Sequence, residues 1–167
     1  ARGVPITTEA CPHHWALTDA AVEESSYDTH TKMHPPLRTA ADVQAIKDGL
    51  ADGTIDVIAT DHAPHAGFEK EVEFIEAPFG ILGLETCWGL TVRDLVRPGV
   101  LTLAQAVHKL AVAPREILGL DVPTLDVGAE ANLTVFDDST EWTFEKRHIR
   151  SKSHNTPFVG APMVGRA

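Results

Sequence analysis

Residues 54–65, TIDVIATDHAPH, decide the fold class of this chain. The nearly continuous apolar run over 54–60 is typical of a strand in a parallel sheet, buried on both faces. It stops at Asp61, so a carboxylate and two imidazoles follow the carboxyl end of the strand, where barrel enzymes place their catalytic groups. Asp61 is therefore a candidate metal ligand and proton acceptor. On the residues alone an alternative stays open, in which this polar cluster is only structural.

A helix and a second strand precede this segment. The β-branched and apolar sequence VPITTEA at 4–10 predicts a strand that ends in a polar loop. Residues 40–50 carry apolar side chains at helical spacing, with Thr39 as the N-cap and Gly53 after the end. Strand, helix and strand in this order predict a βαβ unit with parallel strands and a right-handed crossover. The predicted fold class is α/β, a sheet or a barrel.

The sequence changes character beyond Leu120. Before that point, helices are predicted over 81–96, over 102–111 with a Thr102/Gln105 capping box, and over a short turn from Pro114 to Gly119. After it, residues 127–137 predict a turn and a strand, and residues 141–144 alternate polar with aromatic side chains. We therefore expect a helical and β region over 1–120 and a small β segment over 121–167.

Composition excludes several classes of protein. The 167 residues are 43% hydrophobic, and 24 acidic against 14 basic residues give a net charge of -10. Such a charge repels nucleic acids and anionic membranes. Apolar runs long enough for a membrane helix and the layout of a signal peptide are both missing. Cys11 and Cys87 lie far apart, which favours neither a disulfide framework nor a cysteine zinc site. We expect a cytoplasmic protein in a reducing compartment.

Histidines form two further candidate groups. His13 and His14 are adjacent at a predicted strand end, where neighbouring side chains diverge, so a structural or supporting role is expected rather than a shared metal. In the sequence MHPPLR, two prolines fix a loop that could present His34 and Arg38 to an anion. The alternative there is a rigid surface turn. Surface or packing roles are expected for the other histidines outside 61–65, His30, His108, His148 and His154.

Several motifs together resemble the class I dihydroorotases of the amidohydrolase superfamily. They occur in the family's order and read CPHH at 11–14, KMHPPLR at 32–38, ATDHAPH at 59–65, PFG at 78–80 and GLET at 83–86. The segments GAEANLTVFD at 128–137 and SHNTPF at 153–158 look like the family's closing β segment. The resemblance covers nearly the whole chain and corresponds to the C-terminal portion of the family.

The resemblance implies the last two strands and helices of a (β/α)₈ TIM barrel over 1–120, followed by part of a small composite β domain. A complete barrel takes about 250 residues, so a partial and inactive unit is expected. One or two zinc ions are implied for the complete site, with most of their ligands outside this chain.

The resemblance also assigns roles to particular residues. Asp61 corresponds to a metal ligand that serves as general acid and base. His65, Phe79 and Gly80 correspond to substrate-binding positions, the imidazole toward a carboxylate and the Phe-Gly segment through its backbone. His34 is a departure, because the family usually has asparagine there, although an imidazole can still donate a hydrogen bond.

The reaction implied is the reversible cyclisation of N-carbamoyl-L-aspartate to L-dihydroorotate in de novo pyrimidine (UMP) biosynthesis. Two alternatives stay open: an allantoinase or hydantoinase-type cyclic amidohydrolase, and a non-catalytic dihydroorotase-like subunit that supports aspartate transcarbamoylase. The expected ligand is a small-molecule substrate. The expected protein partners are a second copy in a homodimer or aspartate transcarbamoylase.

Overall fold

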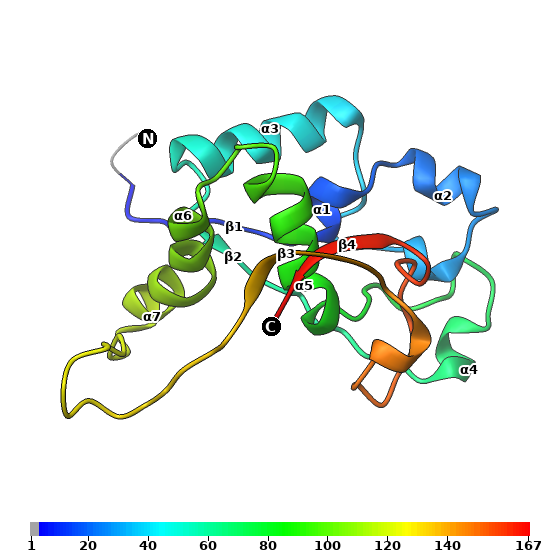
Figure 1. Cartoon of the computed structure of the whole chain (residues 1–167). Coiled ribbons are helices and arrows are strands. Elements are labelled where there is room, and N and C mark those ends of the chain that lie inside the picture. The colour runs from blue at the N-terminus through cyan, green and yellow to red at the C-terminus, as the bar shows by residue number, and fades with distance from the viewer. Residues whose placement is uncertain (1–3) are drawn as a thin grey trace.

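The computed structural model describes residues 4–167 (Figure 1). The prediction that the N-terminus lacks a signal-peptide layout rests partly on residues 1–3, which lie outside the described residues. Within residues 4–167, every helix is too short or too polar to cross a membrane.

Two short parallel strands form the centre of the predicted βαβ unit. Strand β1 (Glu9–Ala10) pairs with β2 (Val57–Ile58), with Glu9 opposite Val57 and Ala10 opposite Ile58. The parallel pairing is confirmed, but both strands are shorter than the apolar runs that predict them. The run before β1 makes few backbone bonds, and its side chains Val4 and Ile6 remain exposed.

Helix α3 (Ala40–Asp52) connects the two strands and follows its local signals closely. Thr39 and Asp42 form a reciprocal capping box at its start. Gly53 ends it in the left-handed conformation, with φ of 84°, which glycine adopts without steric cost. Leu50 of α3 is fully buried. It belongs to a hydrophobic core made of Ala10, Trp15, Leu50, Ile55, Ile58, Cys87, Leu95, Leu101 and Ala106.

The other predicted helices form close to their predicted ranges, but parts of them are π-helical. Helix α5 (Leu84–Thr91) continues as the π-helical segment η2 (Val92–Val96), within the predicted range 81–96. Helix α6 (Leu103–Val107), with the predicted Thr102 cap, continues through the π-helical segment η3 (His108–Val112) into α7 (Ala113–Leu118). Short helical segments that the sequence does not predict are α1 (His13–Ala16), α2 (Ala20–Glu24), η1 (Thr29–Thr31), α4 (Gly67–Lys70) and η4 (Lys146–His148).

The C-terminal segment forms an antiparallel pair, β3 (Asp137–Thr143) with β4 (Pro162–Arg166). Of the turn and strand predicted over 127–137, the strand is wrong, because residues 120–136 form an extended loop (Figure 1). Leu133 and Val135 are exposed there. Their pattern suits a strand, but pairing with β4 begins only at Asp137.

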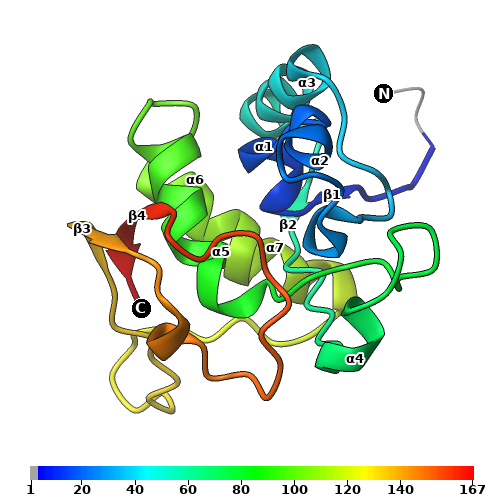
Figure 2. The ribbon, with the colours of Figure 1, turned by 90° about the vertical axis from the view of Figure 1, so that its right-hand side faces the viewer.

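The β3–β4 pair lies against α5, on the side of the molecule away from α3 (Figure 2). Met163 of β4 packs so closely on Gly89 of α5 that a Cβ at position 89 would lie 3.1 Å from the Met163 side chain. A second core surrounds this contact, made of Met33, Leu37, Ile81, Leu82, Leu90, Phe144, Ile149, Phe158 and Met163. The division of the chain between residues 120 and 121 into two domains stays a prediction.

Candidate active site

Asp61 lies beyond the carboxyl end of β2, as the sequence predicts. It has a φ of 46°, a conformation that is uncommon outside glycine and is enriched at functional sites. Its side chain is 44% exposed. The next residue, His62, forms a parallel bridge with Ile81. Asp61 therefore lies between β2 and the bridge that His62 forms with Ile81.

Among the described residues, His13 is the basic side chain that comes within 4.0 Å of the Asp61 carboxylate. Its Nε2 atom lies 4.0 Å from Asp61 Oδ2, which is too long for a hydrogen bond. His13 is buried, and within residues 4–167 this nitrogen has no hydrogen-bond partner. Burial, followed by the neighbouring His14, lowers the pKa of His13 to about 3. Because His13 is neutral near pH 7, the contact is not an ion pair, and the Asp61 carboxylate keeps its charge available for a cation.

His34, His65, Phe79 and Gly80 form a second group. The Nε2–H of His65 donates to the Phe79 carbonyl oxygen at 2.9 Å. The ring centroids of His34 and Phe79 lie 5.2 Å apart. Gly80 has a φ of 97°, and a Cβ there would lie 2.6 Å from Ala63 Cβ, so only glycine fits.

The ring orientation of His65 determines which of its atoms can meet a ligand. Because Nε2 is hydrogen-bonded to the Phe79 carbonyl, Nδ1 is the ring nitrogen that can bind a ligand. Nδ1 lies 3.8 Å from Glu69 Oε2. An anionic ligand at Nδ1 would compete with the Glu69 carboxylate.

Close backbone contacts join the Asp61 segment to the Phe79 segment. The Ala63 N–H donates to the Ile81 carbonyl at 2.8 Å. A Cβ at Gly83 would lie 2.1 Å from the Thr60 carbonyl oxygen. The structure thus brings His34, His65, Phe79 and Gly80 together and places Asp61 against His13. A single pocket that contains both groups stays a prediction.

Asn155 is a site residue that the sequence does not single out. Its side chain is buried and donates to the carbonyls of Ala63 at 2.8 Å and Gly80 at 3.3 Å. Its Oδ1 accepts the N–H of His65 at 3.1 Å. One amide therefore ties three backbone positions of the site together. The available signal is its place in the segment SHNTPF, which the resemblance includes.

His62 and Glu85 connect the same region to α5 and to the C-terminal segment. The Nδ1 atom of His62 accepts the N–H groups of Gly83 at 3.1 Å and Leu84 at 3.3 Å, at the start of α5. Glu85 accepts from the Ser151 hydroxyl at 2.5 Å. These contacts hold α5 beside the site.

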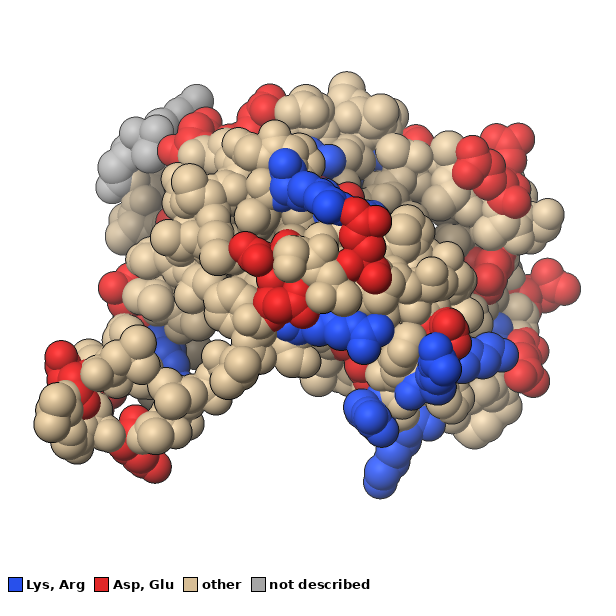
Figure 3. Space-filling model, viewed as in Figure 1, with Lys and Arg blue, Asp and Glu red and all other residues tan. Residues whose placement is uncertain are grey.

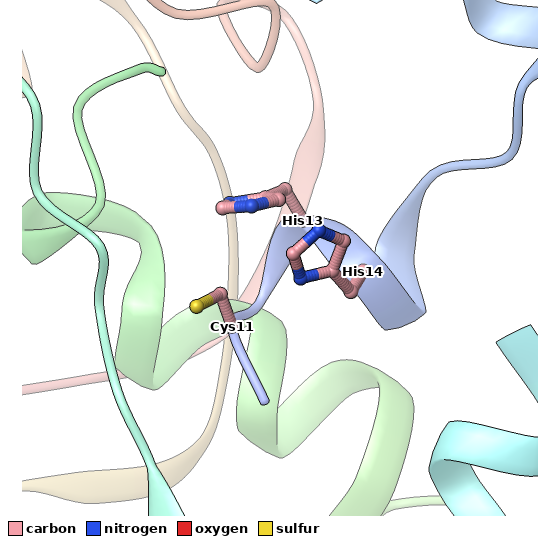
Figure 4. Close-up of side chains that lie close together, drawn as sticks. All are labelled: Cys11, His13 and His14. Carbon is pink, nitrogen blue, oxygen red and sulfur yellow. The ribbon is translucent and has the colours of Figure 1, made fainter. Parts of the chain in front are cut away.

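Cys11, His13 and His14 lie close together where β1 meets α1 (Figure 4). The expectation that the two histidines diverge from a strand end is wrong, because both lie in α1 with ring centroids 4.2 Å apart. One ligand atom from each of the three residues lies within 4.8 Å of the other two. Among the described residues, this cluster is the one group of three ligand atoms close enough together to hold a metal ion.

Comparison with known proteins identifies the family of this chain. The Amidohydrolase family pattern matches residues 1–162. The chain belongs to the amidohydrolase family. It is 52% identical over 165 residues to a dihydroorotase of Pelotomaculum thermopropionicum, and this covers 99% of the chain and 38% of that protein. A dihydroorotase of Citrifermentans bemidjiense is 54% identical over 167 residues, which are 100% of the chain and 39% of that protein. The chain thus spans less than two fifths of these relatives.

Solved structures give the same fold. The L-hydantoinase (dihydropyrimidinase) of Arthrobacter aurescens matches with a TM-score of 0.85 and 28% identity, over 95% of the chain and 36% of that protein. The inactive dihydroorotase-like domain of a CAD-like multifunctional protein of Chaetomium thermophilum has a TM-score of 0.62 and 19% identity, over 98% of the chain and 41% of that structure. The second similarity concerns the fold alone. The predicted family and the α/β barrel fold class are confirmed.

Proposed function

We propose that the complete protein is a dihydroorotase that interconverts N-carbamoyl-L-aspartate and L-dihydroorotate in pyrimidine biosynthesis. One observation carries this proposal: relatives 50 to 54% identical over 98 to 100% of the chain are dihydroorotases. The matching hydantoinase structures are only 21 to 28% identical. The similarity is therefore much greater to dihydroorotases than to enzymes that open other cyclic amides.

Asp61 is proposed to hold zinc and to move the proton. Zinc, when bound, polarises the ring carbonyl and lowers the pKa of the attacking water. The exposed, positive-φ Asp61 carboxylate fits a metal ligand, because the base that contacts it, His13, is neutral and does not compensate its negative charge. In the hydrolytic direction Asp61 accepts a proton from water and delivers it to the departing ring nitrogen. Most other metal ligands are proposed to lie outside this chain.

His65, His34 and the Phe79–Gly80 backbone are proposed to bind the substrate. When His65 Nδ1 carries a proton, this atom, which is directed toward Glu69, would donate a hydrogen bond to the substrate carboxylate. The hydrogen bond from Nε2 to Phe79 fixes the ring for this contact. His34, in ring contact with Phe79, would donate from the position where the family has asparagine.

The proposal includes a small-molecule substrate and a cytoplasmic location. Neither nucleic acid nor membrane binding is proposed, given the net charge of -10. Self-association and association with aspartate transcarbamoylase are proposed as the alternatives for protein partners.

The test is an assay of the complete, purified protein with L-dihydroorotate, hydantoin and allantoin as parallel substrates. We expect turnover of dihydroorotate far above the other two, loss of turnover after chelation, and recovery with zinc. Preference for hydantoin or allantoin would assign the protein to another cyclic amidohydrolase. A zinc-loaded, folded protein without turnover of any of the three would support the non-catalytic subunit.

A further inference from the structure

We propose that Cys11, His13 and His14 bind a divalent metal ion of the zinc class. One thiol and two imidazoles offer atoms within 4.8 Å of one another. A set of nitrogen and sulfur ligands suits zinc and related thiophilic ions rather than magnesium or calcium. In Figure 4 the three side chains gather at the junction of β1 and α1, so residues spaced over only four positions supply the site.

His14 has the hydrogen bond expected of a metal-binding histidine. Its Nε2 lies 3.0 Å from the Pro35 carbonyl oxygen, which can only accept, so Nε2 carries the proton. The Nδ1 atom then keeps its lone pair. Metal-bound histidines commonly donate their second ring N–H to a backbone carbonyl in this way, which fixes the ring.

His13 supplies an unpartnered nitrogen in a buried position. Its side chain is 2% exposed, and Nε2 has no hydrogen-bond partner among the described residues. A buried nitrogen without a partner is costly and needs an explanation. A bound metal would satisfy such a ring.

Cys11 lies where a cation can reach it. Its side chain is buried, yet it lines an open cavity of about 460 Å³ together with His14, Pro35 and Pro36. Burial raises the pKa of the Cys11 thiol, and the carboxylates of Asp61 and Glu9 raise it further, while their negative charge attracts a dication. Binding forms a sulfur–metal bond and releases the thiol proton to solvent.

The location of this cluster predicts an effect on catalysis, a step that rests on the proposed function. His13 Nε2 lies 4.0 Å from Asp61 Oδ2. A cation held by His13 would therefore change the charge next to the carboxylate proposed to transfer the proton. We expect excess thiophilic metal to inhibit turnover through this cluster.

Cadmium titration of the complete protein tests the site directly, since cadmium–thiolate bonds absorb in the ultraviolet. We expect one cadmium–thiolate band per chain in the wild type and in Cys87→Ser, and loss of that band in Cys11→Ser. Cys87 is a matched control because it is also a buried free cysteine. His14→Ala should weaken cadmium binding by about tenfold or more. A band of unchanged intensity in Cys11→Ser would overturn the proposal.

A second measurement covers the case in which Cys11→Ser does not fold. In the wild type, cadmium should slow alkylation of Cys11, measured by peptide mass spectrometry, while Cys87 serves as the internal reference. Equal rates with and without cadmium would also refute the site. Cadmium inhibition of dihydroorotate hydrolysis should weaken at least tenfold in Cys11→Ser. If the protein hydrolyses no dihydroorotate, the band and the alkylation rate still decide the site independently of the proposed function.

Discussion

Replacing Asn155 with alanine removes three hydrogen bonds at once. The amide donates to the Ala63 and Gly80 carbonyls at 2.8 and 3.3 Å and accepts from the His65 N–H at 3.1 Å. Each such bond contributes about 1 kcal/mol, and a buried group left unsatisfied costs about 1 to 3 kcal/mol. His65 and Ala63 are only partly buried, so water can replace some of the loss. We expect the free energy of unfolding to fall by about 2 to 4 kcal/mol.

Denaturant unfolding of the complete protein measures this loss, with Asn132→Ala as the matched control. Asn132 lies in the exposed loop 120–136, and its replacement should change stability by less than about 0.5 kcal/mol. Because Asn155 positions His65 and Gly80, the KM for dihydroorotate should also rise. Equal stability of the two variants together with an unchanged KM would refute the role of Asn155 in holding the site.

Three further perturbations have defined outcomes. Asp61→Asn should lower kcat for dihydroorotate by about 10² to 10⁴ with an unchanged circular dichroism spectrum, and near-normal turnover would contradict the acid–base role. Gly83→Ala should lower the melting temperature strongly, because the new Cβ would lie 2.1 Å from the Thr60 carbonyl oxygen, whereas Gly67→Ala, whose Cβ would meet nothing closer than 3.6 Å, should not. Burial lowers the pKa of Lys70 from 10.5 to about 8, so the unfolded state binds more protons between these values and stability against urea should rise with pH there. Lys70→Met should lack that rise, and parallel pH profiles of the two proteins would disprove the shift.

Local signals predict the βαβ unit well. The capping residue Thr39 and the terminating Gly53 act within one turn of α3, so the sequence around them is sufficient to place the helix. The position of Asp61 after a buried strand follows in the same way from the apolar run before it.

Features that depend on distant partners could not be predicted. A strand over 127–137 fits the alternation of residues, but the partner β4 lies elsewhere along the chain and pairs only from Asp137. Asn155 contacts His65 and Ala63 across 90 and 92 positions of the sequence, and no local pattern carries that information.

The geometry of His13 and His14 was mispredicted for a related reason. Their position after an extended run suggests the end of a strand, where neighbouring side chains point in different directions. The chain instead turns into α1 at His13, and the two rings approach each other. Where a strand ends is set by its pairing partners, and for β1 the partner β2 extends over only two residues.

The loop over 120–136 has a consequence for how sequences of this kind can diverge. Its apolar side chains Leu125, Val127 and Val135 are largely exposed, whereas the C-terminal segment beyond it is anchored by β4 on α5 and by Asn155. The position of the C-terminal segment is thus set by its side-chain contacts with the rest of the molecule, and not by the length of the loop that leads to it. Because closing a longer loop costs little additional entropy, insertions and deletions here should be tolerated during evolution, whereas position 83 should stay glycine because of its close contact with the Thr60 carbonyl oxygen.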